Sequence, residues 1–70
     1  MFSSKIKKIL ESETLKKINF DKNFKDNKLD SLDLMTIFNT IENEYKIKLK
    51  STKLDKVTNF KELYKLLNKN

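Results

Sequence analysis

The residue types that carry out chemistry in proteins are few in this chain, and one serine stands out among them. The chain has no histidine and no cysteine, so a Ser-His-Asp or Cys-His arrangement and a Cys/His metal site are excluded within it. Ser31 follows Asp30 where a polar segment gives way to a periodic apolar one. Asp-Ser pairs commonly begin helices, because both side chains accept hydrogen bonds from the first backbone amides. The pair alone therefore does not identify a function.

The charge around Ser31 differs from that of the rest of the chain. The protein has 70 residues and a net charge of +6, and all sixteen positive residues are lysines. Residues 30–45 contain no lysine and four acids, whereas residues 1–29 carry +4 and residues 46–70 carry +6. We attribute most of the lysine load to a genome-composition bias, because Gly, Pro, Ala and Arg are absent and eight Asn are present. Against that bias, a stretch without lysine indicates that positive charge is kept out of it.

Apolar periodicity predicts an all-α domain over residues 1–70, too small for more than one core. We expect a small bundle of three main helices plus one short helix, with a long loop after the first. Four residues of the first helix share one stripe, with Ser3 or Ser4 as the cap and an end near residues 12–16. This stripe consists of Phe2, Ile6, Ile9 and Leu10.

The helix that begins near Ser31 has the clearest pattern. Its core-facing residues lie within about 60° of one line at ~100° per residue. They are Leu34, Ile37, Phe38, Ile41 and Tyr45. Leu32 and Met35 lie roughly 160° and 100° away from Leu34 on this wheel, beside Ser31. The pattern predicts two exposed apolar side chains with an acidic rim, which is typical of a docking surface.

The remaining segments connect and close the bundle. Residues 17–29 predict a long loop pinned by Ile18, Phe20, Phe24 and Leu29. Thr52 with Asp55 fits a capping box for the short helix, which carries Leu54 and Val57, and Asn59 with Glu62 fits another for the last helix. The apolar side of that last helix comprises Phe60, Leu63, Tyr64 and Leu67. Because the chain has no glycine, we expect Asn19, Asn27 and Asn68 to supply the left-handed turns at helix ends.

Residues 30–67, "DSLDLMTIFNTIENEYKIKLKSTKLDKVTNFKELYKLL", resemble acyl carrier proteins along their whole length without a gap. Asp-Ser-Leu at 30–32 is similar to the attachment signature of that family. "ENEY" at 42–45 resembles the acidic-aromatic end of its second helix, and "IKL" resembles the link that follows. "KVTNF" at 56–60 resembles its turn into the last helix.

The resemblance implies a carrier rather than an enzyme. It implies that a phosphopantetheinyl transferase with Mg²⁺ moves 4′-phosphopantetheine from coenzyme A onto Ser31, and that no metal is bound by the chain itself. Acyl- or aminoacyl-loading and acyl-processing enzymes would then act on a thioester at the end of the arm. The partner recognition residues implied are Asp30, Leu32, Asp33, Met35 and Glu42. We expect a monomer. We also expect a cytoplasmic location, since no apolar run approaches a membrane span and the start "MFSSKIKKIL" lacks the apolar block typical of a signal peptide.

Two features bear on the cargo. The chain lacks the glycine that commonly stands shortly before the serine, and it is basic where fatty-acid carriers are acidic. The run Leu29-Asp30-Ser31-Leu32 resembles discrete carriers of D-alanine or other aminoacyl groups, and carriers of specialised polyketide-type pathways.

Two alternatives stay open at this point. A small basic helical domain that binds nucleic acid needs a recognition helix with positive or amide groups on its exposed face, and the best helix here is net negative. A carrier fold that keeps the docking surface but is never modified is the second alternative.

Overall fold

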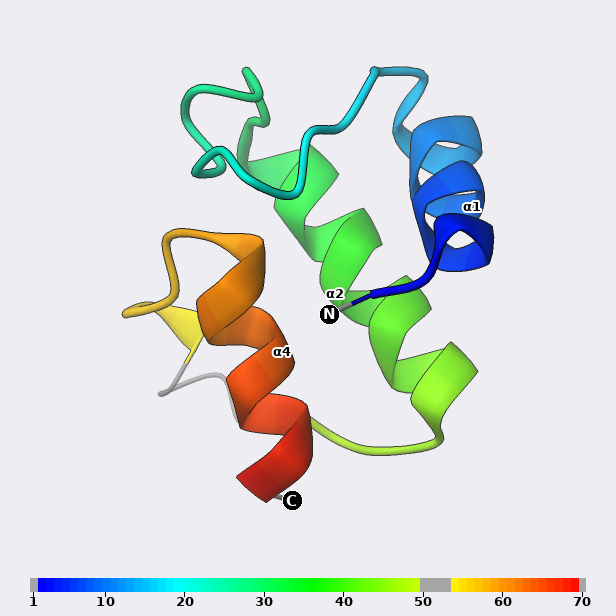
Figure 1. Ribbon diagram of the computed structural model, residues 1–70, viewed down its shortest axis with the longest axis vertical. Helices are drawn as coiled ribbons and strands as arrows, with labels where there is room; N and C mark the ends of the chain where they lie inside the picture. The colour runs from blue at the N-terminus through cyan, green and yellow to red at the C-terminus, as the bar shows by residue number, and fades with distance from the viewer. Residues whose placement is uncertain (1, 50–53, 70) are drawn as a thin grey trace.

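The computed structural model describes residues 2–49 and 54–69, which form three α-helices (Figure 1). These are α1 (Ser4–Thr14), α2 (Ser31–Tyr45) and α4 (Phe60–Lys69). The described residues contain no strand, and their one isolated β-bridge joins Asn23 to Asn59. The predicted all-α class is confirmed. The short helix predicted from Thr52 begins in residues 50–53, outside the described residues, although Leu54 and Val57 do pack half-buried against the core.

The first helix begins and ends where the sequence predicts. The Oγ of Ser3 accepts a hydrogen bond from the amide of Ile6, so Ser3 is the N-cap. Ile6 and Leu10 are buried on the face toward α2, while Ile9 is half-buried. The helix ends at Thr14, whose hydroxyl donates to the carbonyl of Leu10 at 2.8 Å. This back-bond satisfies a buried hydroxyl at the last turn.

The connection from α1 to α2 is long but well held, and in Figure 1 it arches over one end of the bundle. Ile18, Phe24 and Leu29 are buried, and the amide of Phe24 donates to the carbonyl of Thr58 at 2.8 Å. The side chain of Asn27 organises the turn between them. Its Oδ1 accepts from the amide of Asn19, and its Nδ2, which has two hydrogens to donate, lies 2.9–3.2 Å from the carbonyl oxygens of Asn19, Lys22 and Asn23. Of the four apolar residues expected to pin this loop, three are therefore buried, and Phe20 is half-buried against the core.

Aromatic rings fill the centre of the bundle. Phe60 at the start of α4 is fully buried, and its ring centroid lies 4.9 Å from those of Phe20 and Phe24. Phe2 reaches across to α4, where its ring meets Tyr64 edge-on at 5.2 Å. Such tilted contacts stabilise the core by about 0.5–1.5 kcal/mol each beyond the burial of their area. The prediction for Tyr45 is partly wrong, because it contacts the Phe2 ring but remains 38% exposed at the end of α2.

Left-handed backbone occurs at positions that the sequence did not predict. The positive-φ residues of the described chain are Leu15 (58°), Lys28 (59°) and Lys46 (53°), and no asparagine is among them. Leu15 and Lys46 follow the last residues of α1 and α2, and each donates its amide to the carbonyl four residues before it. The expectation that Asn19, Asn27 and Asn68 make these turns is wrong. Asn68 lies within α4, and Asn27 uses its side chain to hold the loop instead.

Local hydrogen bonds cap the start of the last helix, α4. The Oδ1 of Asn59 accepts from the amide of Glu62 at 2.8 Å, as the predicted cap requires. The Oε1 of Glu62 accepts from both the amide and the hydroxyl of Thr58, and these bonds lower the pKa of the Glu62 carboxyl. Of the helices described, none has the length and apolar character to span a bilayer.

Candidate functional site

Ser31 is the first residue of α2, and its side chain is exposed. The start of α2 lies at the end of the bundle where the long connection enters the helix (Figure 1). The first backbone amides of a helix have no intrahelical acceptor, so this end carries partial positive charge. In the part of the chain that the structure describes, the amides of Ser31 and Leu32 have no hydrogen-bond partner. A hydroxyl here is open to an enzyme and close to groups that favour an anion.

The residues on either side of Ser31 hold this helix start in place. Asp30 is the N-cap, and its Oδ1 accepts from the amide of Asp33 at 2.8 Å. In return, the Oδ2 of Asp33 accepts from the amide of Asp30 at 3.2 Å. This reciprocal pair is a capping box, which satisfies two amides that would otherwise lack partners. Ser31 itself is not needed as the cap.

A lysine from outside the helix completes the arrangement. The Nζ of Lys16 lies 2.5 Å from the Oδ2 of Asp33 and 2.9 Å from the carbonyl oxygen of Lys28. The hydrogen bond between the two side chains raises the pKa of Lys16 and lowers the pKa of Asp33. Through these two contacts, Lys16 connects the end of α1 with the end of the loop at Lys28 and with the first turn of α2 at Asp33.

The apolar residues beside Ser31 lie where the sequence places them. Leu32 is 73% exposed and Met35 is 60% exposed, so neither belongs to the core. A hollow of about 290 Å³ borders Ser31 between α2 and the turn before α4. Its other lining residues are Leu34, Met35, Phe38, Leu54, Asp55 and Val57. Apart from Ser31 and Asp55, the residues that line it are apolar.

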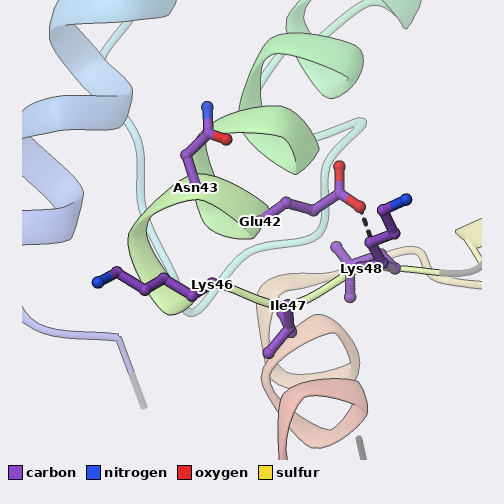
Figure 2. A pocket seen from close by; sticks show the side chains of 6 residues that line it. Glu42, Asn43, Lys46, Ile47 and Lys48 are labelled. Atoms are coloured by element: carbon purple, nitrogen blue, oxygen red, sulfur yellow. Dashed lines mark hydrogen bonds between the residues drawn. The ribbon is translucent and has the colours of Figure 1, made fainter.

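Glu42 lies toward the opposite end of α2 and is engaged with its own chain. Figure 2 shows its side chain turned toward the link after the helix, and its Oε2 accepts from the amide of Leu49 at 2.7 Å. Leu49 is buried, so this bond fixes the returning chain against the bundle. The same region borders a hollow of about 470 Å³ that also contacts Lys46 and Ile47. Of the residues expected to recognise partners, the structure gathers Asp30, Leu32, Asp33 and Met35 around Ser31 and sets Glu42 apart.

Sequence reasoning missed Lys16. Seventeen positions separate it from Asp33, and no local pattern distinguishes one lysine among sixteen. The sequence offered only an indirect indication. An acid in the first turn of a helix that is partly buried beside a loop needs a positively charged or hydrogen-bonding partner.

Comparison with known proteins identifies the family of this chain. The family model of the phosphopantetheine attachment site matches residues 4–67. No match was found among curated proteins or among solved structures. The matched range covers α1, α2 and most of α4, together with the serine at the head of α2. The chain therefore belongs to the family of acyl-carrier-type domains, in which 4′-phosphopantetheine is covalently attached.

Proposed function

We propose that this protein carries acyl or aminoacyl groups as thioesters on a 4′-phosphopantetheine arm bound to Ser31. The observation that carries the proposal is the exposed Ser31 hydroxyl at the start of α2, beside two amides that find no partner among residues 2–49 and 54–69. Attachment turns the hydroxyl into a phosphodiester, which adds one negative charge where the helix end favours an anion. The chain contains no cysteine, so the thiol of a thioester has to come from the arm.

The carrier role assigns no reaction chemistry to this chain. Carrier domains of this family are typically non-catalytic. The acidic groups near Ser31 have structural roles that the hydrogen bonds explain, since Asp30 caps the helix and Asp33 binds Lys16. Bond making at Ser31 therefore belongs to the phosphopantetheinyl transferase, to which this chain presents the hydroxyl.

Recognition by the transferase and by the loading enzymes centres on Leu32 and Met35. Their exposed side chains flank Ser31, and such isolated apolar groups gain free energy when a partner covers them. The Asp30 carboxylate supplies the negative charge that steers a basic partner. Asp33 and Glu42 contribute less than the sequence suggested, because Asp33 is paired with Lys16 and Glu42 is bonded to the Leu49 amide.

For cargo, we propose a short acyl or aminoacyl group. The hollow beside Ser31 has a volume of about 290 Å³, while the interior between the helices is occupied by the rings of Phe2, Phe20, Phe24 and Phe60. A densely packed aromatic interior resists insertion of a long chain, since it has to open at the cost of these contacts. Intact mass of protein isolated from its native cells identifies the group directly.

The test of attachment is the mass of the protein after incubation with coenzyme A, Mg²⁺ and a broad-specificity phosphopantetheinyl transferase. We expect the gain of one phosphopantetheine group in the wild type and none in Ser31→Ala. Ser12→Ala is the matched control, because Ser12 is also an exposed helical serine, and it should gain the group normally. Both variants should melt like the wild type, since neither serine is a helix cap. An unmodified wild type, or a Ser31→Ala variant that still gains the group, would overturn the proposal.

A further inference from the structure

Leu15 combines two features that disfavour a leucine. Its backbone is left-handed, with φ 58° and ψ 29°, a region that side chains with a Cβ enter at a cost of roughly 1 kcal/mol. Glycine and asparagine are the residues that adopt it most readily. The lack of glycine does not explain the choice, since the chain contains eight asparagines. An asparagine here would close the helix with less strain.

The side chain of Leu15 does not offset this backbone strain by packing against the core. It is 89% exposed, more than any other large apolar residue of the described chain. The bond that ends the helix runs from the Leu15 amide to the carbonyl of Glu11 at 2.9 Å, and any residue other than proline can make it. Lys28 and Lys46 share the left-handed backbone, but they place polar ends in water. Leu15 alone among the three exposes an apolar group.

The position of Leu15 links it to the Ser31 end of the molecule. The next residue, Lys16, is bound through its Nζ to Asp33 and to the carbonyl of Lys28. The end of α1 and the start of α2 lie at the same end of the bundle in Figure 1. A standard protein interface covers about 800 Å² on each partner, roughly a sixth of the 5156 Å² surface of this molecule. An enzyme seated over Ser31 therefore extends over neighbouring elements at that end.

We propose that Leu15, which directly precedes the Lys16 that binds Asp33, is a contact residue for the phosphopantetheinyl transferase. The inference rests on the proposed attachment at Ser31. The transferase is the occupant because it has to bring its reacting groups to the Ser31 oxygen itself. Loading enzymes act on the thiol at the end of the arm, so they do not have to bring a catalytic group to the Ser31 oxygen. An apolar socket on the transferase, placed beside the basic groups that meet Asp30, is the surface that Leu15 fits.

The test compares Leu15→Asn with Lys46→Asn. Both substitutions place asparagine at a left-handed position after a helix, and Lys46 lies at the other end of α2 from Ser31. We expect both variants to melt about 2–5 °C above the wild type, because the strain is relieved. The kcat/KM of modification should fall about fivefold or more for Leu15→Asn, and it should stay at the wild-type value for Lys46→Asn.

Each result has one meaning. A wild type that gains no phosphopantetheine defeats the attachment at Ser31 and this inference with it. Normal modification of the wild type with equal kcat/KM for Leu15→Asn defeats the contact role alone. A Leu15→Asn variant that melts lower than the wild type shows that the leucine is there for stability, which also overturns the inference.

Discussion

Replacing Asp30 separates its structural role from its electrostatic one. Its Oδ1 accepts from the amide of Asp33 at 2.8 Å, and its own amide is bound in return. Loss of an N-cap acceptor costs about 1 kcal/mol, with a range of about 0.5–2. A domain of this size has a free energy of unfolding of roughly 3.5–10 kcal/mol. Asp30→Ala should therefore lower the melting temperature by about 4–8 °C.

Asp30→Asn is the matched variant. Asparagine caps helices about as well as aspartate, so the melting temperature should stay within about 2 °C of the wild type. The variant removes only the negative charge of the residue that directly precedes Ser31. If that charge steers the transferase, the rate of modification should fall about three- to fivefold at about 0.05 M salt, and the difference should shrink at about 0.5 M.

Melting followed by circular dichroism and initial rates from intact mass measure the two effects separately. Equal rates for Asp30→Asn and the wild type at low salt would refute the steering role. An Asp30→Ala variant that melts with the wild type would refute the capping argument, because the hydrogen bond to Asp33 would then contribute nothing measurable.

Three further predictions concern the docking surface, the ion pair and the core. Met35→Lys should slow modification several-fold without changing the melting temperature, since Met35 is 60% exposed; an unchanged rate would exclude it from the docking surface. The hydrogen bond to Lys16 lowers the pKa of Asp33 in the folded state. The ionised Asp33 carboxylate therefore stabilises the fold at pH values above its ordinary pKa of 3.8, and this stabilisation is lost as the pH falls through the pKa of the folded protein. Asp33→Asn should accordingly lower the melting temperature near pH 7 and have little effect by about pH 2, where a persistent difference would contradict the ion-pair explanation. Phe60→Ala should lower the free energy of unfolding by about 3–5 kcal/mol, whereas Phe60→Leu should lower it by about 1–2 kcal/mol. Denaturant titration distinguishes the two variants, and equal losses would contradict the packing argument.

The sequence predicts what depends on neighbours within a turn or two. The start of α2 at Ser31, the caps at Ser3 and Asn59, and the exposure of Leu32 all follow from local hydrogen bonding and helical period. The same reasoning identifies the apolar residues of the long loop, since their spacing in a polar segment leaves them no other place than the core.

Contacts between distant residues could not be predicted in this way. The pairing of Lys16 with Asp33 depends on how the loop folds back, and the bond from the Leu49 amide to Glu42 depends on the path of the chain after α2. In each case an acid that was expected to face partner proteins, Asp33 or Glu42, binds a group of its own chain. The exposure of Tyr45 has a similar origin, because it lies at the last turn of α2, where the neighbouring elements no longer cover the helix.

The left-handed turns at Leu15 and Lys46 have a consequence for protein engineering. Designers ordinarily rely on glycine to stop helices and on alanine to bring them close, yet this bundle is written with only twelve kinds of amino acid and includes neither. Phenylalanine rings fill the space between the helices, which small side chains would otherwise let close. Leucine and lysine in a strained left-handed conformation end the helices, where glycine would do so without strain. A restricted alphabet of this kind offers a starting point for building carrier domains from very few building blocks.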